Sequence, residues 1–217
     1  MKDKIIAYFN HRKKQVYGKN NKYSTDLWDE KESIRNKIYD ELISNSSVVA
    51  EIGVRLGENA CMINLRNPSK LYLVDPWIEK GGYPHHSKNN KFFKIVTDVF
   101  ADEENTKILR QKSQDAVLLF EDDYFDVVYI DSGHTYDDVL RDLTLWSKKV
   151  KVGGFIVGDD YFGKENPDDR IKWKQHSYGV IEAVADFTRD NKYKIYYSQK
   201  FKDFPLPAGQ FILQRVQ

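Results

Sequence analysis

Acidic side chains stand at the ends of two apolar stretches in the second half of the sequence. Asp131 closes the run FDVVYID, and Asp159 and Asp160 close the run GGFIVGDD. If both runs are neighbouring strands of one sheet, three carboxylates meet at one edge and repel each other in a low-dielectric cleft. A hard divalent cation removes that conflict, and oxygen ligands favour Mg²⁺, with Mn²⁺ or Ca²⁺ as alternatives. The pattern predicts a metal site at these three residues, although Asp159 and Asp160 could also simply end a strand in a turn.

One histidine lies close to this acidic group. His134 follows Asp131 by three residues and directly precedes Thr135, which with Asp138 matches the capping box of a helix N-terminus. The positive end of the helix dipole and a nearby cation both favour neutral imidazole, the form that a base requires. A lone histidine is more often structural. Because this one lies beside an acidic cluster, we predict that His134 and Asp131 are catalytic, with His134 as the general base.

Two motifs earlier in the chain predict a cofactor that contains a nucleoside. In VAEIGVRLG, Gly53 and Gly57 allow close backbone approach to a ligand, and Glu51 suits an ammonium group better than a pyrophosphate. In LYLVDPW, Asp75 can accept both ribose hydroxyls, and Trp77 is expected to stack near the adenine. Taken singly, each motif also fits a plain turn after a strand. Together, at this separation, they favour the nucleoside interpretation.

Short apolar runs alternate with helical patterns from residue 48 onward. We predict strands at 48–52, 71–74, 107–109, 125–130 and 155–157, and helices at 58–65, 91–100, 136–150 and 180–187, with a further helix ending over 116–120. Uniformly apolar strands that alternate with helices indicate a parallel sheet covered on both faces. The last two predicted strands, 193–197 and 210–213, have no helix between them and favour an antiparallel hairpin. The pattern predicts an α/β fold that differs from the plain dinucleotide-binding fold.

The first 47 residues look helical and polar. Ile34, Ile38 and Leu42 recur at the spacing of one helix face. We expect residues 1–47 to form a helical extension or lid, and residues 48–217 to form the catalytic domain. A chain of 217 residues is long enough for one well-buried core.

Composition excludes several classes of protein. A net charge of +1 gives no reason to expect nucleic acid as a partner, and the basic runs at 11–14 and 19–22 are typical of a solvated face. The single cysteine, Cys61, excludes an intrachain disulfide and a cysteine-based zinc site, and we expect a buried thiol. No apolar run is long enough to span a membrane, and the start lacks a secretory pattern. We therefore expect a cytoplasmic protein without a membrane partner.

Residues 48–187 resemble the metal-dependent sugar O-methyltransferases of antibiotic biosynthesis, which act on the deoxysugars of macrolides and aminocoumarins. The segments IDSGHTYDDVLRDLTLW and VGGFIVGDDY carry the resemblance most specifically. It implies a class I fold that binds S-adenosylmethionine (SAM), with a Rossmann-like, seven-stranded, mostly parallel sheet, helices on both faces and an antiparallel C-terminal hairpin. It implies Mg²⁺ at Asp131, Asp159 and Asp160, and His134 as the base. The expected cofactor-binding residues are Glu51, Gly53, Gly57, Asp75, Trp77, Ser113, Gln114 and Asp131.

The acceptor is the least defined part of this resemblance. The N-terminal region is shorter than in many antibiotic enzymes, and residues 162–177 match no pattern of the family. Because this segment follows the acidic pair directly, we expect a substrate lid, with Tyr161, Trp173 and His176 as acceptor contacts. The expected acceptor is a sugar hydroxyl on a glycan or glycosylated small molecule, for example a rhamnose. The resemblance also implies a homodimer.

Four other classes remain open. A catechol-type O-methyltransferase also uses a metal to hold adjacent hydroxyls, but it usually carries a lysine near the metal and an Asp-Asn pair. A hydroxylase of the cephalosporin type shares the sheet and the acidic cluster, and would depend on iron and a 2-oxoacid. A cofactor-binding module without activity would not need a metal and a base. An NAD oxidoreductase fits least, because the third glycine of its fingerprint is missing.

Overall fold

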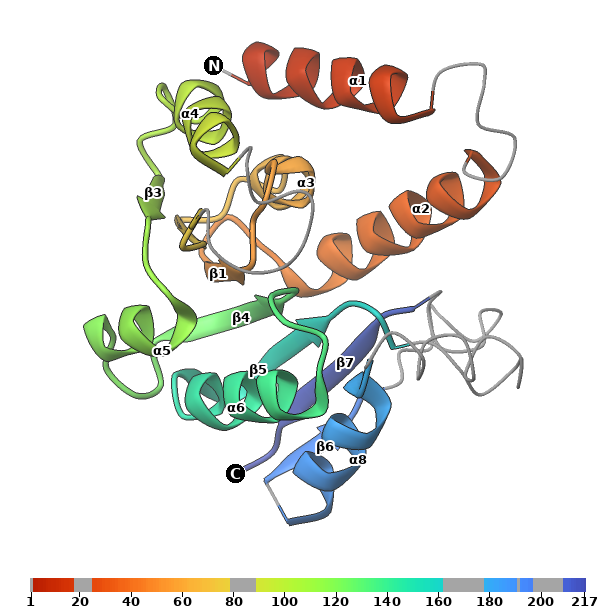
Figure 1. Ribbon diagram of the computed structural model, residues 1–217. Helices are drawn as coiled ribbons and strands as arrows, with labels where there is room; N and C mark the ends of the chain where they lie inside the picture. Colours follow the sequence, from red (N-terminus) through yellow and green to blue (C-terminus); the bar gives the residue numbers. More distant parts are fainter. Residues whose placement is uncertain (1, 18–24, 79–88, 162–177, 191, 197–208) are drawn as a thin grey trace.

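The computed structural model describes residues 2–17, 25–78, 89–161, 178–190, 192–196 and 209–217. A seven-stranded sheet in the order β3-β2-β1-β4-β5-β7-β6 forms its centre (Figure 1). The strands are β1 (Val48–Ile52), β2 (Lys70–Val74), β3 (Thr106–Leu109), β4 (Phe125–Ile130), β5 (Val150–Gly158), β6 (Tyr193–Ile195) and β7 (Phe211–Arg215). The helices are α1 (Asp3–Tyr17), α2 (Thr25–Leu42), α3 (Glu58–Asn64), α4 (Asn89–Val99), α5 (Ser113–Ala116), the 3₁₀ helix η2 (Val117–Leu119), α6 (Tyr136–Ser147) and α8 (Val180–Asp190).

The direction of the strands confirms the expected fold class. Strands β3, β2, β1, β4 and β5 run parallel, while β7 pairs antiparallel with both β5 and β6. The chain proceeds from β1 outward to β2 and β3, and then returns to place β4 on the other side of β1. Ligands of open α/β sheets bind beyond the carboxyl ends of the strands at such a reversal. The fold therefore favours a ligand site at the loops after β1 and β4.

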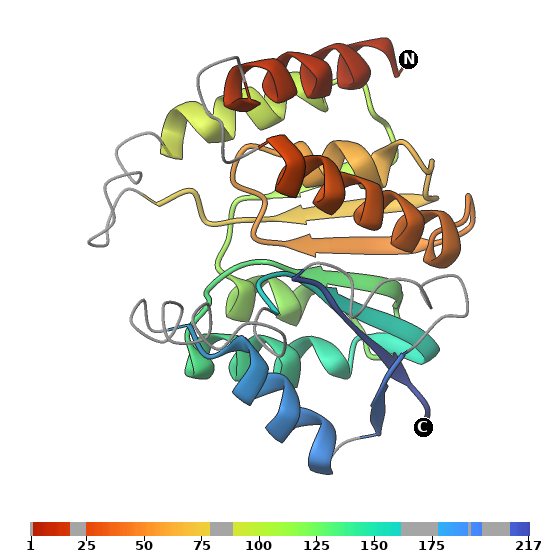
Figure 2. The ribbon, with the colours of Figure 1, turned by 90° about the vertical axis from the view of Figure 1, so that its right-hand side faces the viewer.

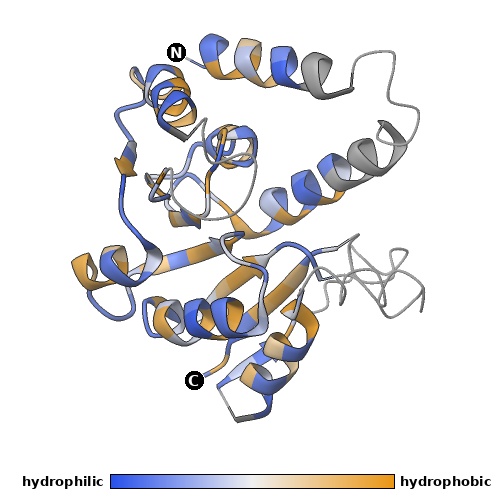
Figure 3. Ribbon diagram, in the orientation of Figure 1, coloured by the Kyte–Doolittle hydropathy of each residue, from blue (hydrophilic) through white to orange (hydrophobic). Residues whose placement is uncertain are grey.

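Helices cover both faces of the sheet. Helices α1, α2, α3 and α4 lie on one face, and α5, α6 and α8 lie on the other (Figure 2). Alternate strand side chains enter two hydrophobic clusters: Val49 packs into the first and Ala50 into the second. Apolar residues gather on the helix sides that face the sheet (Figure 3). Burial on both faces explains why these strands are apolar throughout rather than alternating.

The start of β5 differs from the sequence prediction. Helix α6 ends at Ser147 instead of continuing to residue 150, because β5 already begins at Val150 and runs to Gly158. Gly153 and Gly154 were expected to break the helix, but they lie within the strand, where its register against β4 shifts. Gly153 has a φ of 85°, and a Cβ on Gly154 would lie 2.8 Å from the Asp126 carbonyl oxygen. The two glycines therefore form a bulge in a longer strand.

The N-terminal region is helical, as predicted, and belongs to the hydrophobic core. Ile5 of α1 and Ile34 and Ile38 of α2 are at most 1% exposed and pack into the first cluster. Tyr8 donates from its hydroxyl to the Leu56 carbonyl oxygen at 2.7 Å, in the turn before α3. Helix α1 therefore packs on the loop that follows β1, whereas its role as a lid remains a prediction.

Two further expectations can be compared with the described residues. Cys61 is fully buried, as expected for a thiol in an apolar helix. Among the helices in the described ranges, none has both the length and the apolar character needed to cross a membrane.

Candidate active site

Two carboxylates and one imidazole meet where β4 and β5 end. Asp131 directly follows β4, Asp160 follows β5, and His134 lies in the loop that leads into α6. Each residue offers one potential ligand atom, and the three atoms lie within 4.8 Å of one another. His134 Nδ1 lies 3.1 Å from Asp160 Oδ2. The structure thus brings these three residues together at the edge of the sheet that the sequence pattern indicates.

His134 is held by contacts with two segments. The hydroxyl oxygen of Thr135 accepts a hydrogen bond from the Asp138 amide at 3.2 Å, which confirms the predicted helix cap. The His134 carbonyl oxygen accepts from the Gly179 amide at 2.8 Å. Its ring stacks on Tyr178, with centroids 4.8 Å apart and an interplanar angle of 11°. Sequence reasoning missed Tyr178, because nothing local to that residue points to His134.

Asp159, the third expected metal ligand, has different partners. Its Oδ2 lies 2.5 Å from Arg35 Nη2, and the two side chains are 8% and 5% exposed. Its Oδ1 accepts a hydrogen bond from Gln210 Nε2. Asp160 has a positive φ of 59°, so the backbone turns after β5, and Asp160 contacts His134 while Asp159 contacts Arg35. The structure therefore does not bring Asp159 into the group of three, and a metal role for it would require a change in its contact with Arg35.

Arg35 belongs to a buried polar network that links α2 to the sheet. Gln210 donates to Asp159 and accepts from the Tyr129 hydroxyl at 2.8 Å, and both Gln210 and Tyr129 are fully buried. Burial alone would lower the pKa of Arg35, but Tyr129 and Asp159 outweigh that effect and hold the pKa well above its ordinary value. Arg35 thus remains a cation and balances the carboxylate of Asp159. No sequence motif indicated this pair, since its members lie on distant elements.

Glu51, the acid of the first cofactor motif, lies inside the protein with one oxygen unsatisfied. The residue is 1% exposed, and its Oε1 accepts from Asn59 Nδ2 at 3.3 Å. Tyr39 orients that amide by donating to Asn59 Oδ1 at 2.6 Å. Among the described residues, Glu51 Oε2 has no hydrogen-bond partner. Burial raises the pKa of Glu51 well above its ordinary value. A buried carboxyl oxygen without a partner is costly, and a cationic ligand group would supply that partner and favour the charged form of Glu51.

Asp75 stabilises the turn that follows β1. Its Oδ2 accepts from the amides of Val54 at 3.0 Å and Arg55 at 2.9 Å, and its Oδ1 accepts from the Trp77 amide at 2.7 Å. A carboxylate has about four lone-pair sites, so these three bonds leave little capacity for two ribose hydroxyls. The predicted ribose contact would therefore require at least one amide bond to be exchanged.

Trp77 is a core residue in this structure. It is 1% exposed, its indole Nε1 donates to the Arg55 carbonyl oxygen at 2.9 Å, and its ring packs on Phe93. Its predicted stacking on adenine would require the ring to become accessible.

The glycines of the first motif have positive φ angles, 90° at Gly53 and 81° at Gly57. A Cβ on Gly53 would overlap the carbonyl oxygen of Asp131. The turn after β1 therefore contacts the backbone of the acidic site directly. Glycine is required here for close packing within the protein, in addition to any approach of a ligand.

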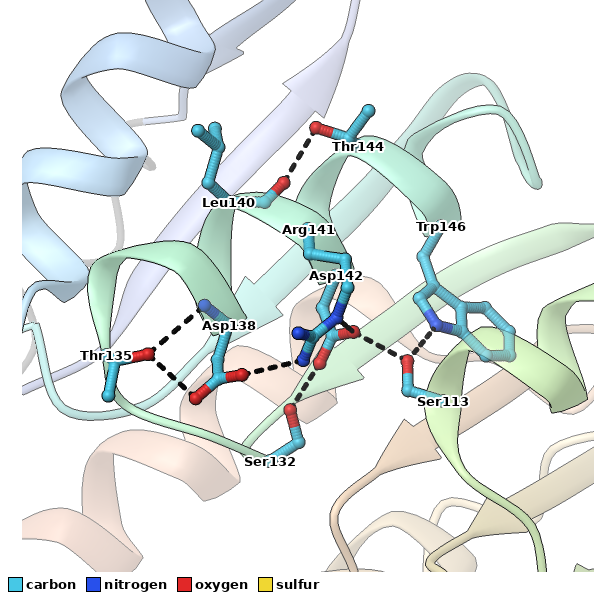
Figure 4. Close-up of polar contacts among 9 residues, drawn as sticks. All are labelled: Ser113, Ser132, Thr135, Asp138, Leu140, Arg141, Asp142, Thr144 and Trp146. Carbon is cyan, nitrogen blue, oxygen red and sulfur yellow. Dashed lines mark hydrogen bonds and ion pairs between the residues drawn. The ribbon is translucent and has the colours of Figure 1, made fainter.

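Ser113 and Gln114 begin α5 after β3, where the resemblance implies adenine contacts. Gln114 is exposed. The Ser113 hydroxyl donates to Asp142 Oδ1 at 2.7 Å and accepts from Trp146 Nε1 at 2.8 Å (Figure 4). Asp142 is fully buried and was not a predicted site residue. A signal for it exists in the sequence, because Asp142 interrupts the apolar helix face that contains Val139, Leu143 and Trp146.

The expected acceptor contacts are mostly beyond the described ranges. Tyr161 is half-buried, and its amide donates to the Gly209 carbonyl oxygen at 2.9 Å. Its ring meets Phe211 edge-on at 5.9 Å between centroids. Trp173, His176 and the expected lid at 162–177 lie outside the described residues.

The sheet order, the antiparallel C-terminal strand and the site beyond β1 and β4 define a Rossmann-like methyltransferase fold. A family model described as a methyltransferase domain matches residues 50–161, just over half of the chain. The chain therefore belongs to this methyltransferase domain family.

Proteins of known structure share the fold at low sequence identity. A Corynebacterium glutamicum protein is 13% identical, with a TM-score of 0.61 over 99% of this chain and 91% of its own. A Klebsiella pneumoniae protein, provisionally described as an O-methyltransferase, is 14% identical, with a TM-score of 0.55 over 98% and 87%. Geranyl diphosphate methyltransferase in complex with SAM is 12% identical, with a TM-score of 0.54 over 85% of both chains.

One relative is found by sequence comparison. An uncharacterized protein of Acanthamoeba polyphaga mimivirus is 23% identical over 160 residues. The match covers 72% of this chain and 66% of that protein.

Proposed function

We propose that this protein transfers a methyl group from SAM to a hydroxyl of a sugar, on a glycan or a glycosylated small molecule, with help from a divalent metal. The observation that carries the proposal is the group of Asp131, His134 and Asp160 beside the turn after β1. A methyltransferase domain does not need two carboxylates and an imidazole in order to bind SAM alone. Their presence supports activation of an acceptor oxygen.

The cofactor side of the site fits SAM. SAM supplies an electrophilic methyl group on a sulfonium, and its methionine end carries an ammonium group. Glu51 Oε2, buried and without a partner among the described side chains, offers the acceptor that such an ammonium group requires. Gly53 lets the turn after β1 pack against Asp131, so the same loop borders both the cofactor and the acidic group. Geranyl diphosphate methyltransferase, which shares the fold, was solved with SAM.

The acidic side of the site fits a divalent cation. Asp131 and Asp160 supply carboxylate oxygens, which Mg²⁺ and Mn²⁺ prefer, and His134 lies beside Asp160 at the border of this group. A bound cation lowers the pKa of a coordinated hydroxyl and makes it a better nucleophile. Asp159 contacts Arg35, so we assign the cation to Asp131 and Asp160, whose ligand atoms lie close together.

His134 is arranged to act as the base. If its Nδ1–H donates to Asp160 Oδ2 at 3.1 Å, the lone pair lies on Nε2, which can take the proton of the acceptor hydroxyl. Stacking on Tyr178 and the cap at Thr135 hold the ring in place. Holding two reactants in the correct orientation contributes roughly 7–11 kcal/mol to such reactions, so positioning is the main task of the protein.

An aromatic diol is the second candidate acceptor. The specific observation in its favour is the Tyr178 ring, which stacks on His134 and offers an aromatic surface for a flat substrate beside the base. The same metal and base would serve both substrates, so a comparison of acceptors must decide between them.

The test begins with calorimetric titration of SAM and S-adenosylhomocysteine (SAH), with and without Mg²⁺ or Mn²⁺. We expect micromolar binding, reduced about tenfold or more in Glu51→Gln because a buried charge-assisted bond is lost. Asp98→Asn removes an exposed carboxylate on α4 and serves as the matched control. Methyl transfer is then measured on rhamnosides and catechols, with EDTA added to remove the metal. Absence of SAM and SAH binding would exclude the proposal, and activity that requires iron and a 2-oxoacid would indicate a hydroxylase.

A further inference from the structure

Asp142 of α6 is a buried carboxylate that connects the two loops of the candidate site. Its Oδ1 accepts from the Ser113 hydroxyl at 2.7 Å, and its Oδ2 accepts from the Ser132 hydroxyl (Figure 4). Ser113 begins the segment after β3 where the cofactor adenine is expected. Ser132 lies between Asp131 and His134 in the loop after β4. One side chain therefore binds a residue from each half of the site.

The interior location of Asp142 is costly without these bonds. A carboxylate taken out of water requires hydrogen bonds or a countercharge, and an apolar side chain on this helix face would avoid the requirement. Burial raises the pKa of Asp142, and the hydrogen bonds from Ser132 and Ser113 act in the opposite direction. Arg141 gives Asp142 little charge compensation. Its Nε lies 3.8 Å from Asp142 Oδ1, and its side chain is 45% exposed and also pairs with Asp138. The serine hydroxyls are thus the main polar partners of Asp142 among the described residues.

The surrounding contacts restrict both loops. Trp146, one turn further along α6, donates its indole N–H to Ser113 Oγ at 2.8 Å. The single hydroxyl proton of Ser113 is given to Asp142, so it is not available to donate to a ligand. On the other loop, a Cβ on Gly133 would lie 2.7 Å from the Asp138 side chain, so this loop packs closely on the start of α6. Helix α6 therefore acts as a common support for both loops.

We propose that Asp142 is a positioning residue that holds the Ser113 segment and the Asp131–His134 loop in register, so that the cofactor and the metal are bound at a defined separation. The proposal rests on the proposed function, because it assigns SAM to the first segment and the cation to the second. Asp142 itself contacts neither ligand. Its effect on each ligand passes through one serine.

The variants Asp142→Asn, Ser113→Ala and Ser132→Ala separate these two connections. Thr144→Ala is the matched control, because Thr144 is exposed on the same helix and its hydroxyl donates to the Leu140 carbonyl oxygen, away from both serines (Figure 4). Affinities for SAH and for Mn²⁺ are measured by calorimetry on each variant. We expect Ser113→Ala to weaken SAH about fivefold, and Ser132→Ala to weaken Mn²⁺ about tenfold, with little effect on the other ligand. Asp142→Asn should weaken both, and Thr144→Ala neither.

A double variant distinguishes positioning from direct contact. If Ser113 acts through Asp142, the loss of SAH affinity in Asp142→Asn/Ser113→Ala equals the larger single loss instead of the sum. Three results would overturn the proposal. The losses of affinity could be additive in the double variant, or each serine variant could weaken both ligands equally. The third is an Asp142→Asn protein that binds both ligands as well as Thr144→Ala does.

Amide hydrogen exchange gives a measurement that needs no ligand. Asp142→Asn should accelerate exchange over residues 112–116 and 131–135, whereas Thr144→Ala should leave both segments as in the wild type. If the wild type binds no SAH but this exchange pattern is found, the proposed function fails, and Asp142 still holds the two loops together without the assigned ligands. If SAH binds and the two variants exchange alike, the positioning role fails and the proposed function stands.

Discussion

Replacing His134 with alanine tests the central chemical assignment. The imidazole Nδ1 lies 3.1 Å from Asp160 Oδ2, and the side chain is 34% exposed, so Nε2 can reach an acceptor bound at the site. A positioned general base contributes about 10²–10⁴-fold to the rate, which corresponds to roughly 2.7–5.4 kcal/mol at about 1.36 kcal/mol per factor of ten. We expect turnover to fall by this factor in His134→Ala, while SAH affinity stays within about twofold of the wild type.

The assay must separate a base from a metal ligand, because His134 belongs to the group of possible ligands. Turnover is measured by mass spectrometry of the methylated acceptor, and Mn²⁺ affinity by calorimetry on the same preparation. A base role predicts Mn²⁺ affinity close to that of the wild type. His11→Ala, which removes an exposed histidine of α1, is the matched control and should behave as the wild type.

Two results would refute the reasoning. Unchanged turnover in His134→Ala would remove the residue from the mechanism. A loss of Mn²⁺ affinity of about tenfold or more, in proportion to the loss of turnover, would show that the imidazole binds the metal. In that case the base must be sought among other groups.

The remaining predictions concern stability. The pKa of Glu51 is raised above its usual value near 4.5, so the folded state disfavours the ionised form, and the stability of the protein falls as the pH rises from that value toward the raised pKa. In thermal unfolding, Glu51→Gln should therefore be more stable than the wild type at pH 7, and the difference should shrink toward pH 4. A difference that does not depend on pH would contradict this origin. Arg35→Met removes the guanidinium that pairs with the buried Asp159 carboxylate and should cost about 3–5 kcal/mol in urea unfolding. Adding Asp159→Asn should recover much of that loss, and simple additivity would exclude the pairing. Gly53→Ala should destabilise the protein by well over about 1 kcal/mol, because the new Cβ would overlap the backbone of Asp131. Gly153 has a similar φ but open space around it, so Gly153→Ala should cost only about 1 kcal/mol. Equal losses of melting temperature in the two variants would argue against the overlap.

The elements of the sheet could be predicted because their signals are local. The strand at residues 125–130 was predicted with the bounds that β4 has, since an apolar run rich in β-branched and aromatic residues suits a buried strand. The hairpin of β6 and β7 followed from two strands without an intervening helix. The start of β5 was mispredicted because Gly153 and Gly154 act equally well as a helix end or as a bulge. The choice between them depends on how β5 pairs with β4.

The sequence by itself determined the fold class and the edge of the sheet at which Asp131, His134 and Asp160 meet. Parallel strands bring their carboxyl ends to one edge, so residues that follow them converge without any knowledge of packing. Only the tertiary structure decided which carboxylates are balanced by the protein. Arg35 reaches Asp159 from α2, and Ser113 and Ser132 reach Asp142 from two separate loops. Each of these contacts joins segments that are distant in the chain. Burial and pairing of a charge depend on such neighbours, which spacing along the sequence does not reveal.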